Sequence, residues 1–167
     1  MFLFISNFVQ VWEKEAKATL RILEALTDAS LDQLVAAQDR TLGRIAWHLV
    51  TTIPEMMART GLILESINED APLPRTAEEI IHNYREVSNS LVTAVRSQWK
   101  DQTLLEKRDM YGETWTNGYT LSTLIDHQIH HRGQMTVLMR QAGLKVPGIY
   151  GPSREDWKGM GMEPPLI

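Results

Sequence analysis

The stretch "TLSTLIDHQIHHRGQMTVLMRQAG" (residues 120–143) contains three of the five histidines in a chain of 167 residues. Its apolar residues recur with the period of an α-helix, about 3.6 residues per turn. Thr120 is a suitable N-cap, and Gly143 is a suitable residue just beyond the last turn. The stretch therefore predicts one long amphipathic helix.

Two of the three histidines share a face of this helix. At about 100° per residue, His127 and His131 lie about 40° apart and one turn from each other, whereas His130 points to the polar side. An i,i+4 pair allows two imidazoles to converge on one ion, as in the H-x-x-x-H motifs of zinc enzymes. The same spacing also occurs on ordinary helices, so the pair alone leaves a metal site and a structural role open.

Three further segments have helical periodicity, at residues 7–26, 41–64 and 76–99. Threonine stands at the N-cap position of the second and the third. Four helices with short or moderate connections predict an all-α protein, a four-helix bundle that forms a single domain over residues 1–167.

Two segments outside these helices are less regular. Residues 100–119 alternate loosely and predict either an irregular loop or a small hairpin. The tail, residues 145–167, is rich in proline and glycine and is expected to wrap the surface with one short helical turn. We expect these two segments and the loop at 65–76 to shape the lining of any cleft.

Composition excludes several classes of function. The net charge of −4 argues against a nucleic-acid partner, which would need clustered lysine and arginine. The chain has no cysteine, which removes disulfides, thiolate metal sites and a cysteine nucleophile, and favours the cytoplasm. The apolar N-terminus lacks a basic start and a cleavage site, and no apolar stretch reaches the roughly 20 residues that span a bilayer, so no membrane association is expected.

A metal site needs a ligand from another helix. His48 lies at the edge of the apolar stripe of its helix, although a histidine in that position more often makes an ordinary hydrogen bond. His82 has no histidine partner at helical spacing. Trp47 points about 130° away from the apolar stripe of the same helix. We therefore expect Trp47 to be covered by the C-terminal tail or by a second subunit.

Two stretches together carry a family resemblance: "RTLGRIAWHLVTTIPEM" (residues 40–56) and "LIDHQIHHRGQMTVLMRQAGLKVPGIYGP" (residues 124–152). They resemble the DinB/YfiT-like family of small bacterial metalloproteins, and the similarity extends over nearly the whole chain. The resemblance implies an up-down-down-up four-helix bundle. It also implies a three-histidine metal site with His48, His127 and His131 as ligands.

Three imidazoles leave at least one coordination position open, which is the catalytic rather than the structural arrangement. All-nitrogen ligands suit a divalent transition metal, with Zn or Ni favoured and Fe or Cu also compatible. The resemblance implies a transferase that uses a low-molecular-weight thiol, and a homodimer. Metal-assisted hydrolysis and a metal-binding stress-response protein without turnover are the alternatives.

Four residues near the histidines are candidates for supporting roles. Glu55 lies two turns beyond His48 and is the candidate general base for hydrolysis, although an exposed helix glutamate is the more common interpretation. Gln134 is placed to orient an imidazole or a substrate group. Arg132 is expected to pair with an acid elsewhere, and Gly133 to permit close helix packing.

Overall fold

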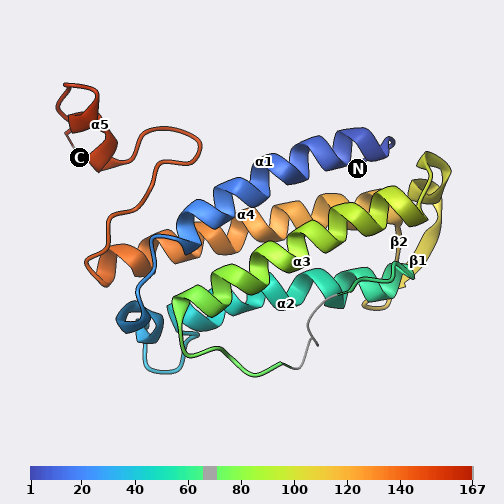
Figure 1. Ribbon diagram of the computed structural model, residues 1–167, viewed down its shortest axis with the longest axis horizontal. Helices are drawn as coiled ribbons and strands as arrows, with labels where there is room; N and C mark the ends of the chain where they lie inside the picture. Colours follow the sequence, from blue (N-terminus) through green and yellow to red (C-terminus); the bar gives the residue numbers. More distant parts are fainter. Residues whose placement is uncertain (66–70, 167) are drawn as a thin grey trace.

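The computed structural model describes residues 1–65 and 71–166, in which four long helices lie side by side (Figure 1). Their bounds are Ile5–Leu23 (α1), Leu42–Thr60 (α2), Ala77–Gln98 (α3) and Asn117–Gln141 (α4). Helices α1 and α4 run in one direction and α2 and α3 in the other, and α1 and α2 each pack against both α3 and α4. The predicted mostly helical fold is confirmed.

N-cap hydrogen bonds account for where α2 and α3 begin, and a glycine accounts for where α2 ends. The Thr41 hydroxyl accepts a hydrogen bond from the Arg44 amide at 3.0 Å, and the Thr76 hydroxyl accepts one from the Glu79 amide at 3.2 Å, so both predicted N-caps are confirmed. Helix α2 ends four residues earlier than expected, because Gly61 takes a left-handed conformation with φ of +81°. Helix α1 is displaced toward the N-terminus relative to the predicted 7–26 and is followed by the short helix η1 (Asp28–Asp32).

The start of α4 corrects the predicted N-cap. Thr116, not Thr120, caps the helix, and its hydroxyl accepts a hydrogen bond from the Tyr119 amide at 3.3 Å. The Thr120 hydroxyl instead bonds back to the Thr116 carbonyl inside the first turn. At the other end Gly143 has φ of +75°, as predicted for the residue that follows a helix.

Residues 100–119 contain a β-hairpin, which is one of the two alternatives predicted for this segment, so the all-α fold class is corrected to a mostly helical protein with a small two-stranded sheet. The short helix η2 (Asp101–Leu105) leads into strands β1 (Lys107–Met110) and β2 (Glu113–Thr116), which pair antiparallel. Tyr111 and Gly112 form the two-residue turn with φ of +60° and +85°. Positive φ at both positions is the geometry that matches the twist of paired strands.

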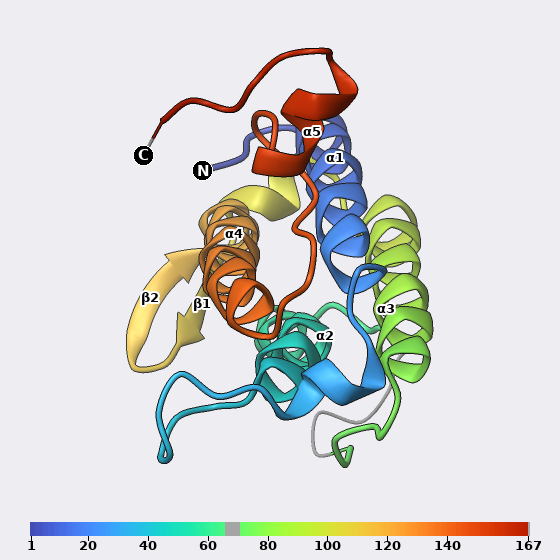
Figure 2. The ribbon, with the colours of Figure 1, turned by 90° about the vertical axis from the view of Figure 1, so that its left-hand side faces the viewer.

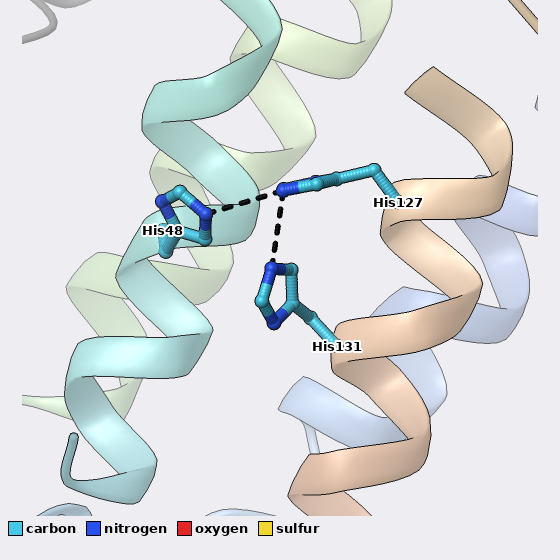
Figure 3. A group of neighbouring side chains, drawn as sticks. All are labelled: His48, His127 and His131. Carbon is cyan, nitrogen blue, oxygen red and sulfur yellow. Dashed lines mark hydrogen bonds between the residues drawn. The ribbon is translucent and has the colours of Figure 1, made fainter. Parts of the chain in front are cut away.

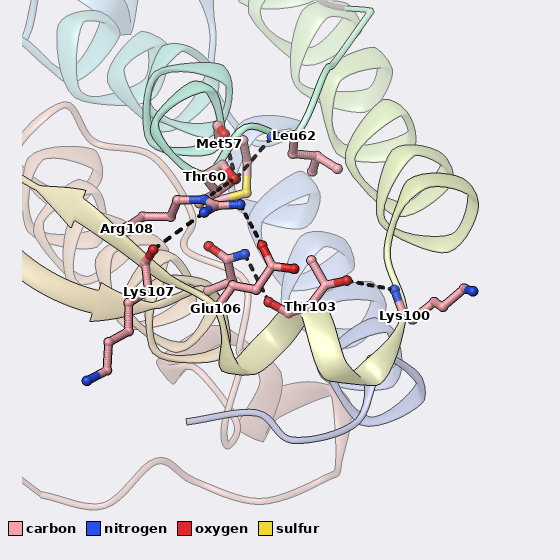
Figure 4. A network of polar contacts seen from close by, with 9 residues as sticks. Met57, Thr60, Leu62, Lys100, Thr103, Glu106, Lys107 and Arg108 are labelled. Atoms are coloured by element: carbon pink, nitrogen blue, oxygen red, sulfur yellow. Dashed lines mark hydrogen bonds and ion pairs between the residues drawn. The ribbon is translucent and has the colours of Figure 1, made fainter.

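The hairpin is attached to the C-terminal end of α2 through Arg108 (Figure 4). The Arg108 Nε–H donates to the Thr60 carbonyl at 3.0 Å, and its guanidinium pairs with Glu106 at 2.6 Å. The Thr60 carbonyl is one of the last in the helix and has no partner within it, so Arg108 satisfies a group that the helix leaves open.

All four long helices contribute to one apolar core. The side chains at its centre are almost completely excluded from solvent: Phe8, Trp12, Leu49, Ile53, Ile80, Tyr84, Leu91, Leu121, Leu124, Met135 and Leu138. Within residues 1–65 and 71–166, no helix combines the length and the apolar character needed to cross a membrane.

Trp47 is buried, but not by the tail, so that prediction is wrong. Its side chain is only 4% exposed, and its indole N–H donates to the Ala71 carbonyl at 3.0 Å. The segment between α2 and α3 therefore covers it, and no second subunit is needed to do so. The tail contains the short helix α5 (Arg154–Gly159), which lies outside the packed helices (Figure 2).

A buried ion pair joins α1 to α4. The guanidinium of Arg132 lies 2.6 Å from the Glu15 carboxylate, and also donates to the Glu15 carbonyl and the Thr19 hydroxyl. Tyr150 from the tail donates its hydroxyl to the same carboxylate. Burial acts to raise the pKa of Glu15, but the hydrogen bonds from Tyr150 and Arg132 outweigh it, so that the pKa is lowered.

The structure tests the predictions made for Arg132 and Gly133 of α4. The acid expected to pair with Arg132 is Glu15, so that prediction is confirmed. The prediction for Gly133 is wrong, because a Cβ there would meet no described atom within 4 Å and the residue is exposed.

The substitution Glu15→Gln is expected to lower the free energy of unfolding by about 3 kcal/mol, because it leaves the buried Arg132 charge without a counter-charge. Glu13→Gln is the matched control on the same helix as Glu15, since it breaks an exposed pair with Arg96 of α3 and should cost less than about 1 kcal/mol. Urea unfolding of both variants measures the difference. Equal losses would contradict a structural role for the buried pair.

Candidate metal centre

Three histidines from two helices bring their Nε2 atoms to one point (Figure 3). The Nε2 atom of His127 lies 3.2 Å from that of His48 and 3.1 Å from that of His131. His48 comes from α2, and the other two come from successive turns of α4. The predicted proximity of these three side chains is therefore confirmed.

A buried glutamine fixes the register of α4 against α2 beside the site. Gln128 is 1% exposed, and its amide N–H donates to the Leu49 carbonyl at 2.9 Å. Its carbonyl oxygen accepts a hydrogen bond from the Tyr84 hydroxyl on α3 at 3.1 Å. Gln128 follows His127 and Leu49 follows His48, so this hydrogen bond aligns the two helices at the level of the imidazoles.

Hydrogen bonds orient two of the three rings. The Nδ1 atom of His131 lies 2.7 Å from the Gln134 carbonyl oxygen, and since that oxygen only accepts, Nδ1 carries the proton and Nε2 keeps its lone pair. The Nδ1 atom of His48 lies 3.2 Å from the Thr52 hydroxyl, which itself donates to the His48 carbonyl. The same hydroxyl lies 3.5 Å from Nε2 of His48, and the shorter contact favours Nδ1 as the donor, which leaves the Nε2 lone pair facing the cluster.

The environment keeps these imidazoles neutral. Burial is the main cause that lowers the pKa of His48 and of His127 to about 4, and neighbouring histidines and Arg40 add to it. Burial also lowers the pKa of His131, against an opposing hydrogen bond to Gln134. Metal ligation requires neutral imidazole, so the three side chains are ready to bind an ion at neutral pH.

The spacing fits a tetrahedral transition metal ion. Bonds of about 2.0–2.1 Å at tetrahedral angles place neighbouring ligand nitrogens about 3.3 Å apart, close to the separations between these Nε2 atoms. Facing lone pairs at such distances repel one another unless a proton or a cation lies between them. The three histidines can therefore hold a metal ion.

The other histidines lie outside the group of three that can hold an ion. His82 and His130 are exposed, as the helical faces predict for His130, and the His130 ring lies against that of His131 with 4.9 Å between the ring centroids. The Glu55 carboxylate pairs with Arg59 at 2.9 Å and accepts a hydrogen bond from Tyr111 at 2.7 Å. One oxygen is engaged by Arg59 of the same helix and the other by Tyr111 of the hairpin, and the described contacts include none with a histidine.

Two cavities flank the cluster. One, of about 360 Å³, is lined by His48 together with residues of α2 and of the segments on either side of that helix. The other, of about 530 Å³, is lined by His131, Gln134 and several apolar side chains. Of the segments expected to shape a cleft, only Ala71 and Pro72 of the loop at 65–76 line these cavities, and residues 66–70 lie outside the described part.

Sequence reasoning missed the segment that precedes α2. Residues 35–40 contribute Val35, Asp39 and Arg40 to the cavity at His131, and Arg40 also lines the cavity at His48. Thr52 was missed as well, although its position one turn after His48 on the same helix is a usable signal.

The chain matches a known family over its length. The model of the DinB family matches residues 1–165. The uncharacterized protein YrdA of Bacillus subtilis (strain 168) is 49% identical over 167 residues, which is the full length of both chains.

Two solved structures are also similar. A DinB-like protein from Bacillus cereus ATCC 10987 is 48% identical, with a TM-score of 0.86 over 90% of this chain and 100% of that one. YjoA, a DinB-like protein from Bacillus subtilis, is 17% identical, with a TM-score of 0.67 over 86% and 96% of the two chains. The second match concerns the fold alone.

The substitution Gln134→Ala is expected to weaken metal binding by roughly tenfold or more, because it removes the acceptor that orients His131. Gln141→Ala changes an exposed residue of the same helix and should leave the affinity unchanged. Competition titration with a chromogenic chelator measures both. Equal affinities would show that Gln134 does not orient the ligand.

The metal-free protein is expected to lose stability as the pH falls from 6.5 toward 4. In this interval His48 and His127 bind protons in the unfolded chain but stay neutral in the folded protein, so protonation favours unfolding. Protonation of carboxylates also lowers the free energy of unfolding over this pH interval. The wild type is therefore compared with the double variant His48→Gln/His127→Gln. Its stability should fall less over this interval in urea unfolding with a chelator present. Parallel pH profiles would contradict the lowered pKa values.

Proposed function

The chain belongs to the DinB family, and we propose that it is a metal-dependent transferase for a low-molecular-weight thiol, with His48, His127 and His131 as the metal ligands. The observation that carries this proposal is the convergence of three Nε2 atoms, with one cavity lined by His48 and another by His131. The packing directions of the long helices support the up-down-down-up bundle that the family resemblance implies.

Three protein ligands favour a catalytic ion over a structural one, since structural zinc sites are closed by four. Nitrogen ligands favour Zn or Ni, with Fe or Cu also compatible. A bound divalent ion would supply a Lewis acid that lowers the pKa of a thiol or a water molecule at its open position.

Other residues of the chain orient the histidine rings and keep them neutral. Gln134 and Thr52 hold the rings of His131 and His48, and burial keeps the rings neutral. In the proposed reaction the thiol sulfur forms a bond to an electrophilic carbon. The bond from that carbon to its leaving group breaks with its electron pair, and the thiol proton is released to solvent.

Two cavities favour a reaction of two substrates over hydrolysis. A hydrolase needs a base beside the water that attacks, and the candidate Glu55 is engaged with Arg59 and Tyr111 instead. A transferase needs room for a thiol and for an electrophile, and the cavity lined by His48 and the cavity lined by His131 provide it. The absence of cysteine fits a nucleophile that arrives from solution. The homodimer and the cytoplasmic location stay predictions.

Purified protein loaded in turn with Zn²⁺ and Ni²⁺ should bind one ion per chain and consume a thiol from a panel of bacterial thiols in the presence of a chromogenic electrophile. His127→Gln should lose both properties, and His82→Gln, at an exposed histidine of α3, should keep both. Thiol consumption and metal content are measured on the same samples.

The pattern of losses separates the alternatives. Metal binding without consumption of any thiol, but with cleavage of ester or amide substrates, would make the protein a hydrolase. Metal binding without either activity would favour a metal-binding protein without turnover. Full metal binding by His127→Gln would overturn the site itself.

A further inference from the structure

The buried ion pair of Glu15 and Arg132 belongs to a polar network that reaches the tail. The Tyr150 hydroxyl accepts a hydrogen bond from the Arg132 guanidinium and donates one to the Glu15 carboxylate at 2.5 Å. Glu15 and Arg132 are 6% and 2% exposed, so the tail supplies a partner that water cannot easily replace. We call residues 144–150, which lead from the end of α4 to Tyr150, the strap; it passes between α4 and α1 (Figure 2).

The strap can leave the bundle without unfolding a helix. Gly143, with φ of +75°, separates it from the last turn of α4. Within residues 144–150, Val146 is the only buried side chain, and the Tyr150 side chain is 64% exposed. Segments with few buried contacts open locally at a lower cost in free energy than the core does. The strap is therefore held mainly by Val146 and by the Tyr150 hydroxyl.

From Arg132 the network continues through the bundle. Arg132 also donates to the Thr19 hydroxyl on α1 at 3.1 Å. Burial raises the pKa of Tyr84 on α3, and a hydrogen bond with the Thr19 side chain opposes that rise. The Tyr84 hydroxyl donates to Gln128 at 3.1 Å, and Gln128 donates to the Leu49 carbonyl at 2.9 Å. The network therefore connects the tail to all four long helices.

The network includes the residue that directly follows each histidine of the metal site, namely Leu49, Gln128 and Arg132. Gln128 and Arg132 repeat the i,i+4 spacing of His127 and His131 one residue later, about 100° around the helix. One turn of α4 thus presents two imidazoles on one side and two buried anchors on another. A displacement of either anchor moves the backbone of the adjacent histidine.

We propose that Tyr150 is a positioning residue for the metal site, and that docking of the strap and binding of the metal ion are coupled. The proposal rests on the three-histidine site of the proposed function and concerns its regulation. With the strap docked, Arg132 and Glu15 have all their partners and hold the turn of α4 that carries His127 and His131. With the strap undocked, each loses one partner and the turn is held less firmly. Because such coupling is reciprocal, a bound ion also favours the docked strap.

The first test measures Zn²⁺ affinity by competition with a chromogenic chelator. Tyr150→Phe removes the hydroxyl but keeps the ring, and it should weaken Zn²⁺ binding by about fivefold or more. Tyr119→Phe is the matched control, because it removes the hydroxyl of an exposed tyrosine on α4, and it should leave the affinity unchanged.

A second control separates positioning from stability. Ser88→Ala removes the buried hydrogen bond that the Trp12 indole donates to Ser88 at 3.0 Å, and neither residue belongs to the network. This variant should lose stability in urea unfolding but keep the Zn²⁺ affinity of the wild type. If Ser88→Ala loses as much Zn²⁺ affinity as Tyr150→Phe does, the positioning role is overturned.

The reciprocal test measures tryptic cleavage after Lys145 in the full chain, with the products identified by mass. Trypsin must bind the residues on both sides of the cut, including the buried Val146, so the rate follows the population of the undocked strap. Saturating Zn²⁺ should slow this cut by about fivefold or more in the wild type. Cleavage after Lys107, in strand β1, is the internal control and should change much less.

The outcomes separate this proposal from the function on which it rests. If the wild type binds Zn²⁺ but Tyr150→Phe binds it equally well, or if Zn²⁺ slows both cuts equally, the coupling is overturned and the metal site stands. If the coupling is found but the protein consumes no thiol, the proposed transfer reaction fails and the role of Tyr150 stands. A wild type that binds no metal ion would overturn both.

Discussion

The packing of α2 against α4 is the constraint on which the rest of the site depends. His48 belongs to one helix and His127 and His131 to the other, so a shift of one turn, about 5.4 Å, would separate their ring nitrogens beyond the reach of one ion. The buried hydrogen bond from Gln128 to the Leu49 carbonyl sets this register between the residues that follow His127 and His48. A polar side chain at the centre of an apolar interface must find its partners, and in the observed alignment Gln128 has both the Leu49 carbonyl and the Tyr84 hydroxyl.

Buried polar groups position α4 on its other sides too. Tyr84 joins Gln128 to α3, and Arg132, next to His131, joins α4 to Glu15 of α1. Each contact involves a residue adjacent to a histidine of the cluster, so the same short stretch of helix faces the site on one side and is anchored on the others. Such contacts add specificity of arrangement more than net stability, because the desolvation of buried polar groups offsets much of their attraction.

The histidine cluster lies between two chemically different spaces. Arginine and tryptophan line the cavity at His48, whereas Val35, Val137 and Leu138 contribute an apolar wall to the cavity at His131. Arg40 of the segment before α2 lines both cavities, and the position of that segment follows from the cap at Thr41 and from η1, which packs against α2. Arg40 lines both cavities and Asp39 the one at His131, so the two spaces differ in their share of apolar side chains and not in the presence of charge.

The sequence by itself determined the helices, the pairing of His127 with His131 and the exposure of His130, because helical periodicity is local and can be counted along the chain. The family resemblance added His48. Only the tertiary structure decided that Gln128 aligns the helices, that the segment after α2 covers Trp47, that Glu55 faces the hairpin, and that Arg40 and Arg44 border the site. These facts depend on contacts between residues far apart in the chain, and no local pattern specifies which distant groups the packing of helices will bring together.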